Sequence, residues 1–172
     1  MPETGFHAQF IELFEAHFRR LYRYLNRLSG DAELAADIAQ EAFVKLYQRG
    51  SLPDAPAAWL ITVAMNLFRN AVKGRRRRLE LLTPARVEGI LADPPALPDQ
   101  AIERNDTRDR VRAALDRMSE REREMLLLQA EGYSYREIAA ALDLNEASIG
   151  VFLARARRAF RALYEESSDA PG

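Results

Sequence analysis

The chain has 172 residues, of which 48% are hydrophobic and 30% are charged, and its formal net charge is −1. These values are typical of a soluble protein with one hydrophobic core or two small ones, and they exclude a chain that is disordered throughout. Cysteine is absent, so disulfides, zinc fingers and cysteine nucleophiles are excluded as well.

The first residues and the hydropathy of the chain argue against export and against membrane insertion. Residues 1–7 have neither the basic start nor the apolar segment of a signal peptide. No apolar run approaches the roughly 20 residues that a helix needs to cross a bilayer. We therefore expect a cytoplasmic protein.

Apolar residues at steps of three and four predict an amphipathic helix over residues 10–28. The two histidines of the chain, His7 and His17, are not one helical turn apart and belong to no carboxylate-histidine motif. We expect them to lie on the solvated surface, and we expect no bound metal and no other cofactor.

A second helix is predicted over residues 32–48. Its expected buried residues are Ala35, Ile38, Ala39, Ala42, Phe43 and Leu46. Residues three and four apart share a helix face, so Asp37, Gln40 and Glu41 form one compact acidic patch on the other side. From these residues alone, an ordinary solvated face is the more common explanation for such a patch.

A third helix is predicted from Ala57 to Lys73, with Gly74 as a left-handed C-cap. Its expected buried residues are Trp59, Leu60, Val63, Ala64, Leu67 and Ala71. A separate stripe carries Thr62, Asn66, Arg69, Asn70 and Lys73 and continues into Arg75, Arg76, Arg77 and Arg78. Cations that meet phosphates and amides that meet base edges are typical of a nucleic-acid surface. The alternative is a solubilising face that leads into a basic linker.

Residues 79–105 contain four prolines with acidic residues nearby and lack a clear helical period, which predicts a flexible interdomain linker. Helical periodicity resumes after it. The sequence therefore predicts an all-α protein, in which two small helical domains, residues 1–78 and 106–172, are joined by this linker.

The C-terminal domain contains two capping boxes, Ser119 with Glu122 and Ser134 with Glu137, each of which begins a helix. After a tight turn, Asn145 is expected to cap a longer basic helix. The apolar residues of that helix recur at helical spacing as Ile149, Leu153, Ala156, Phe160 and Leu163. A short helix, a tight turn and a longer basic helix indicate a helix-turn-helix, whose second helix lies in a DNA major groove.

The motifs of common enzymes are missing. The sequence contains no glycine-rich phosphate loop and no arrangement of nucleophile, histidine and acid. The carboxylates of Asp37 and Glu41 lack the glutamate-x-x-histidine pairing that helical metal sites use. We therefore predict that the protein is not an enzyme.

The order and spacing of these elements resemble a bacterial sigma factor of the extracytoplasmic-function group over nearly the whole chain. Residues 31–47 are similar to conserved region two of that family, and residues 59–70 to the segment that melts and reads the minus-ten promoter element. Residues 115–161 are similar to region four. The resemblance implies a subunit that is inert alone, binds core RNA polymerase and directs promoter-specific initiation.

The resemblance also implies roles for single residues. Asp37, Gln40 and Glu41 fall in the segment that docks on the clamp helices of the polymerase largest subunit. Asn66 matches the position that captures a base flipped from the non-template strand. The implied contacts to the minus-ten element are Thr62, Asn66, Arg69, Asn70, Lys73, Arg75 and Arg76.

Region four of the family binds the minus-thirty-five element and the polymerase flap, which implies DNA contacts by Ser148, Val151, Arg155 and Arg158. The family usually has a basic residue or two early in this helix, but this chain has Gly150, Val151 and Phe152. We therefore expect recognition through phosphates, helix-end amides and DNA shape. The alternative is that region four mainly binds a protein.

Two further expectations concern partners. The exposed surfaces of both regions are candidates for masking by an anti-sigma factor encoded elsewhere. The alternative to a sigma factor is a stand-alone helix-turn-helix regulator with a helical sensing domain, which predicts a dimer on palindromic DNA without polymerase. That alternative leaves the basic surface of residues 62–78 unexplained.

Overall fold

The structure is a computed structural model that describes residues 2–81 and 100–169. Within these ranges all regular secondary structure is helical, which confirms the predicted all-α class. The helices are α1 (Pro2–Ser29), α2 (Ala32–Arg49), α3 (Pro56–Glu80), α5 (Gln100–Arg117), α6 (Glu120–Ala130), α7 (Tyr135–Leu142) and α8 (Glu146–Asp169).

Local capping explains where several helices begin. Asp31 accepts a hydrogen bond from the Leu34 amide (3.0 Å) and begins α2. Ser134 and Glu137 form the reciprocal capping box that the sequence predicts at the start of α7. The Asn145 side chain accepts from the Ala147 amide (3.0 Å) at the start of α8. These side chains satisfy amides that have no partner inside the helix.

The helix-turn-helix is formed by α7 and α8, as predicted. Asp143 ends α7 in the left-handed conformation, with φ 55°, and thereby makes the turn tight. Ile138, Ala139 and Leu142 of α7 are buried, as are Ile149, Leu153 and Ala156 of α8. The apolar faces read from the sequence thus pack against each other, with α5 and α6 also in contact with α8.

Helix α3 differs from the prediction in two ways. It does not end at Gly74 but continues to Glu80, and Gly74 keeps a negative φ inside the helix. Its buried set includes Ile61 and Met65, whereas Trp59, Val63, Leu67 and Ala71 are only partly buried. The reason is that α3 packs on both α2 and α7, so a second face of the helix is covered.

The linker predicted at residues 79–105 lies mostly outside the described residues. Its two ends are helical where they are described, because α3 reaches Glu80 and α5 begins at Gln100. The domain limits stay a prediction. We refer below to α1–α3 as the N-terminal half and to α5–α8 as the C-terminal half.

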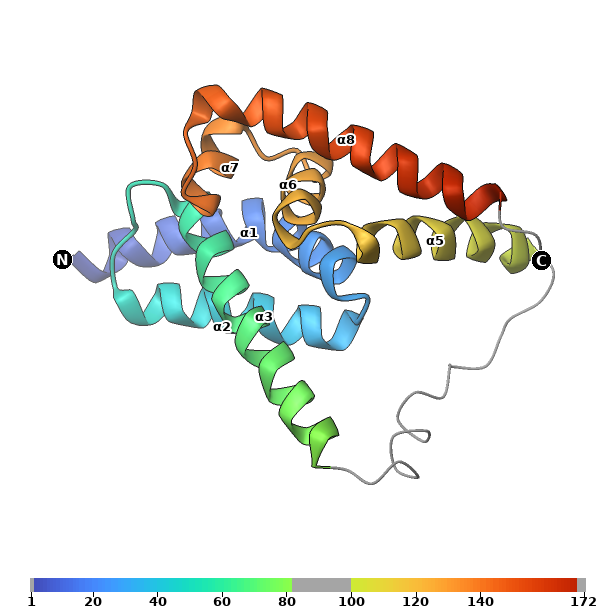
Figure 1. The fold of residues 1–172 in the computed structure, drawn as a ribbon. Helices are drawn as coiled ribbons and strands as arrows, with labels where there is room; N and C mark the ends of the chain where they lie inside the picture. The colour runs from blue at the N-terminus through green and yellow to red at the C-terminus, as the bar shows by residue number, and fades with distance from the viewer. Residues whose placement is uncertain (1, 82–99, 170–172) are drawn as a thin grey trace.

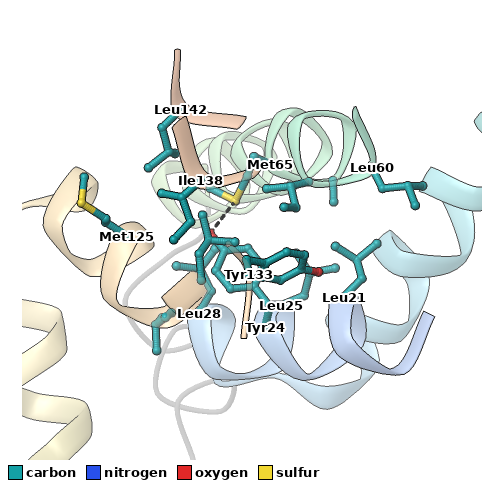
Figure 2. Close-up of a cluster of buried hydrophobic side chains, with 14 of the residues drawn as sticks. Leu21, Tyr24, Leu25, Leu28, Leu60, Met65, Met125, Tyr133, Ile138 and Leu142 are labelled. Atoms are coloured by element: carbon teal, nitrogen blue, oxygen red, sulfur yellow. Dashed lines mark hydrogen bonds between the residues drawn. The ribbon is translucent and has the colours of Figure 1, made fainter. Parts of the chain in front are cut away.

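The two halves pack on each other (Figure 1). Helix α1 contacts α6 and α3 contacts α7, and the buried residues of both halves form one continuous cluster. Figure 2 shows its centre, where Tyr24 and Met65 of the N-terminal half lie beside Tyr133 and Ile138 of the C-terminal half. The Tyr24 hydroxyl donates to the Met65 Sδ atom (3.2 Å). The two predicted helical domains thus share a buried core.

Candidate nucleic-acid interface

The predicted stripe on α3 lies at the surface. Every member is exposed, and we call the set the α3 stripe: Thr62, Asn66, Arg69, Asn70 and Lys73. The Thr62 hydroxyl donates to the Ala58 carbonyl (2.9 Å), so it is directed back onto its own helix. The two asparagines carry both a donor and an acceptor, which is the chemistry that base edges require.

The basic end of α3 projects beyond the rest of the fold (Figure 1). Arg75 makes an ion pair of 2.7 Å with Asp31, and Arg76 approaches Glu80 at 4.0 Å. The Leu34 amide and the Arg75 guanidinium lower the pKa of Asp31 below its usual 3.8. Arg75 therefore holds α3 against the start of α2, while the remaining cations of this end are exposed.

One member of the α3 stripe has a partner in the other half of the molecule. The Arg69 guanidinium is 3.2 Å from the Glu124 carboxylate and 3.7 Å from that of Glu120, both on α6. The Glu124 side chain is only 4% exposed, and burial raises its pKa above the usual 4.5 while Arg69 lowers it. The structure thus places a predicted DNA contact against a buried acid.

The acidic patch predicted on α2 is a separate surface. Asp37, Gln40 and Glu41 are all exposed on the face opposite to the buried residues of α2. The predicted buried set of this helix is fully confirmed. Val44, one turn beyond Gln40 and Glu41, is 51% exposed, so the patch continues into apolar surface. Charged groups beside exposed apolar groups are typical of a protein interface.

The residues predicted on α8 face solvent to different degrees. Val151 is 56% exposed, Arg155 and Arg158 are exposed, and Ser148 is half-buried. The Arg158 Nε donates weakly to the Ala154 carbonyl (3.4 Å). After the exposed Glu146 at its first residue, the early part of the helix is therefore small and neutral at the surface, and its positive charge begins about one turn beyond Val151.

The residues between the two halves were not predicted from the sequence. The Glu131 side chain is 3% exposed and pairs with Arg23 (3.0 Å) and Arg27 (3.1 Å) of α1. Arg20 lies 3.9 Å from the centre of the Tyr133 ring. A signal was present, because these arginines recur at steps of three and four on one face of α1. On α6, likewise, Glu124 lies on the same face as Leu127 and Leu128.

The described residues contain no group of three His, Cys, Asp or Glu side chains arranged to hold a metal ion. His17 instead contacts Arg20, with its Nδ1 atom 3.1 Å from the guanidinium. Among the helices at 2–81 and 100–169, none is long and apolar enough to span a membrane.

Two solved structures share this fold. The sigma factor RpoE, in complex with the anti-sigma factor NepR from Bartonella quintana, aligns with a TM-score of 0.63 at 23% identity, over 91% of this chain and 97% of that one. CnrH, in complex with the cytosolic domain of CnrY, aligns with a TM-score of 0.64 at 21% identity, over 99% and 100%. At such identities the likeness concerns the fold.

Curated relatives are more similar in sequence. The ECF RNA polymerase sigma factor EcfG of Rhodopseudomonas palustris is 33% identical over 79% of this chain and 74% of its own length. SigL of Mycobacterium tuberculosis is 31% identical over 90% and 88%. SigE of Mycolicibacterium smegmatis is 32% identical over 87% of this chain, which spans 59% of that relative's length.

Two family descriptions match successive parts of the chain. Residues 13–78 match Sigma-70 region 2, and residues 108–160 match Sigma-70 region 4. The first range contains the acidic patch of α2 and the α3 stripe, and the second contains the helix-turn-helix. A stand-alone regulator is not favoured, because the N-terminal half is itself a sigma-factor region. The chain therefore belongs to the ECF RNA polymerase sigma factors, which direct transcription initiation.

Proposed function

We propose that this sigma factor is a non-enzymatic, cytoplasmic subunit that binds core RNA polymerase and places it on promoters by two separate DNA contacts. The acidic patch of α2 binds the clamp helices of the largest subunit. The α3 stripe reads and melts the minus-ten element, and α8 binds the minus-thirty-five element.

The observation that carries this proposal is the exposed surface of α3. Amides at Asn66 and Asn70 share one face with the cations of Arg69 and Lys73, and the helix projects as a basic end. Opening a duplex costs a few kcal/mol for each unstacked base. Amide bonds to an extruded base, together with phosphate contacts by the cations, offset that cost.

Helix α8 supports a different kind of DNA contact. Its exposed start offers Val151, which suits a thymine methyl group but donates no hydrogen bond from its side chain. Arg155 and Arg158 lie later on the helix and suit phosphates. We propose that α8 mainly positions the protein on the upstream element through the DNA backbone and shape.

Protein partners are proposed from the remaining surfaces. The acidic patch suits a basic surface on the polymerase, and such complementarity acts on docking rate and orientation as well as affinity. The polymerase flap is the proposed protein partner of region four. Both structures of similar fold contain an anti-sigma factor or a second protein chain, which supports an anti-sigma factor as a further partner.

Charge reversal on α2 tests the proposal. In the variant Asp37→Arg with Glu41→Arg, we expect the helical fold to be kept, because both side chains are exposed, and binding to core polymerase to be lost. Co-purification with core polymerase measures this. The matched control is Glu12→Arg with Glu15→Arg on the exposed side of α1, which should bind normally. Normal co-purification of the α2 variant would contradict the assignment.

A further inference from the structure

The four consecutive arginines at the end of α3 do not share one face of the helix. Arg77 follows Lys73 by four positions and Asn70 by seven, so it lies on the face of the α3 stripe, one turn beyond its last member. Arg75 is two positions from both Lys73 and Arg77, a rotation of about 200° that places it on the opposite side of the helix. Arg77 therefore continues the α3 stripe, and the predicted DNA contact Arg75 does not.

Arg75 instead continues the buried face of α3. Steps of four, three and four positions lead to it from the buried Ala64 through Phe68 and Ala71, which are partly buried. On this side its guanidinium pairs with the Asp31 carboxylate at 2.7 Å. Within the part of this end that the structure describes, no other ion pair reaches outside α3. Asp31 thus fixes the projecting end of α3 to the rest of the N-terminal half.

Asp31 is itself held in place at the start of α2. Its Oδ1 atom accepts from the Leu34 amide at 3.0 Å, and its own amide donates to the Ser29 hydroxyl at 3.1 Å. The second carboxylate oxygen, Oδ2, accepts from Arg75. Because the backbone fixes this carboxylate, it offers the guanidinium one position, and the pair sets where the end of α3 lies.

The ion pair with Asp31 is made where α3 has least support of its own. No residue of α3 beyond Met65 is buried. Gly74, immediately before Arg75, lies inside the helix, and a glycine weakens a helix because it loses more backbone freedom than other residues on folding. An exposed ion pair contributes little to a well-packed helix. In a marginal turn, the same contribution is enough to favour the helical state.

We propose that Arg77 is a further DNA contact of this protein, which binds a phosphate of the double-stranded promoter beside the minus-ten element. Asp31 is its positioning residue. By pairing with Arg75, Asp31 keeps α3 helical past Gly74 and so keeps Arg77 on the face of the α3 stripe. The inference rests on the proposed function, because it takes the α3 stripe as the surface that faces the minus-ten element.

The distance along α3 places Arg77 at the duplex and not at the extruded base. It lies eleven positions beyond Asn66, about 16 Å along the helix axis, which spans about five base pairs along one DNA strand. The chain continues from this end of α3 to the half that contains α8, the proposed contact of the upstream element. The upstream, double-stranded side of the minus-ten element is therefore the DNA nearest to Arg77, whose planar fork of donors suits a phosphate group.

Binding of two DNA probes by core polymerase with this protein tests the contact. One probe is a fork from a promoter that the protein transcribes, with duplex upstream of the minus-ten element and only the non-template strand through it. The other probe is that single strand alone. Arg77→Ala should weaken binding to the fork about tenfold. It should also make the plot of log binding constant against log salt concentration less steep by about 0.9.

Binding of Arg77→Ala to the single strand should be unchanged, because that probe lacks the duplex. The matched control is Arg19→Ala on the exposed side of α1, which removes the same charge and should leave binding to both probes unchanged. Unchanged binding of Arg77→Ala to the fork, or an equal loss on both probes, would overturn the proposed duplex contact.

The substitution Asp31→Asn tests the positioning role by the sign of its effect. Asparagine caps a helix as well as aspartate does, so α2 should keep its start, but the amide lacks the charge that pairs with Arg75. Removal of a negative charge by itself favours binding to DNA. If Asp31 positions Arg77, binding to the fork should weaken instead, by about threefold. The substitution should have no further effect in the Arg77→Ala background.

The control for this charge change is Glu33→Gln. It removes the same charge from the first turn of α2 and leaves the pair of Asp31 with Arg75 in place, so it should not weaken binding to the fork. If Asp31→Asn binds the fork as tightly as the unchanged protein, or more tightly, Asp31 is not a positioning residue.

The substitution Gly74→Ala tests whether the pair acts by keeping α3 helical. Among the described residues, nothing lies within 4 Å of a Cβ atom built at Gly74, and this glycine has a negative φ, so alanine fits there. Alanine strengthens a helix relative to glycine. Added to Asp31→Asn, it should therefore restore binding to the fork. No restoration would overturn the role of the pair in keeping this turn helical.

The same probes separate this inference from the proposed function. If core polymerase binds the fork no more tightly with the unchanged protein than without it, the proposed function fails and the inference fails with it. If Asn66→Ala weakens binding to the fork, but Arg77→Ala and Asp31→Asn do not, the proposed function stands and only this inference fails.

Discussion

Helices α3 and α8 are the two long helices that we propose to contact promoter DNA, and they are held in the fold differently. The extensive contacts of α8 are all with α5, α6 and α7, inside its own half. Helix α3 contacts α1 and α2 of its own half and α7 of the other half. It also carries Arg69, whose partner Glu124 lies in the other half. The surface chemistry differs too, since α3 offers amides where α8 offers small neutral side chains. The helix that we propose to read bases is thus also the one that takes part in the contact between the two halves.

The largest expected effect concerns the buried faces of the two helices. Ile61 of α3 and Leu153 of α8 are both 0% exposed, so Ile61→Ala and Leu153→Ala should each lower the free energy of unfolding by about 2–5 kcal/mol. Urea denaturation measures this. Only Ile61→Ala should also lengthen the distance between fluorescent labels on the exposed sites Lys45→Cys of α2 and Arg161→Cys of α8, because, of these two helices, only α3 packs on both halves. Equal changes in that distance would remove the contrast between the helices.

The next effect concerns base reading. Asn66→Ala should lower minus-ten open-complex formation about 30-fold, because an amide contact to a base is worth about 2 kcal/mol. Permanganate footprinting measures the melted bases. Binding to core polymerase should be unchanged, since Asn66 lies outside the acidic patch of α2. Equal melting by the variant and the unchanged protein would contradict the role of this side chain.

A smaller effect is expected at α8. Arg155→Ala and Arg158→Ala should each make the plot of log binding constant against log salt concentration less steep, by the amount that corresponds to about one phosphate contact. Each should also weaken binding to all upstream sequences alike. Titrations at several salt concentrations, on matched and altered minus-thirty-five sequences, measure both quantities. A loss confined to one base sequence would show that α8 reads bases directly and would make the two helices alike.

The smallest effect is a dependence on pH at the contact between the halves. Burial, and then the Arg20 charge, lower the pKa of His17 below 6.5, and Glu137 acts in the opposite direction. The unfolded chain then binds the proton more readily than the folded protein. The contribution of His17 to the free energy of unfolding is therefore present above pH 6.5 and is lost as the pH falls through 6.5 toward the lower pKa of the folded protein. His17→Gln should reduce this loss between about pH 7.5 and about pH 5.5, measured by urea midpoints. The buried Glu124 has a raised pKa and opposes the loss at lower pH in both proteins, so an unchanged pH dependence in His17→Gln would exclude His17 as the cause.

The comparison of α2 with α3 shows what could be predicted from the sequence. Helix α2 buries one face only, and a single helical period identified all six of its buried residues. Helix α3 buries two faces, and its second partner, α7, lies more than 50 residues further along the chain. A single period could not identify Ile61 and Met65, because the need to bury them arises only when the halves pack.

The same contrast between local and long-range features holds for the candidate site. The exposure of the α3 stripe, of the acidic patch on α2 and of Val151 on α8 followed from local helix geometry. The pairing of Arg69 with Glu124 did not, because it joins side chains 55 positions apart on different halves. The continuation of α3 past Gly74 was missed for another reason. A glycine tolerates the helical conformation as readily as the left-handed one, and strong helix formers follow it.

Run-off transcription with core RNA polymerase tests whether this protein directs initiation at promoters. A library of genomic fragments is transcribed with core polymerase alone and with core polymerase plus this protein. We expect discrete transcripts that begin at defined promoters only when the protein is present, and that are lost in the double variant Asp37→Arg with Glu41→Arg. The same transcripts with and without the protein would contradict it.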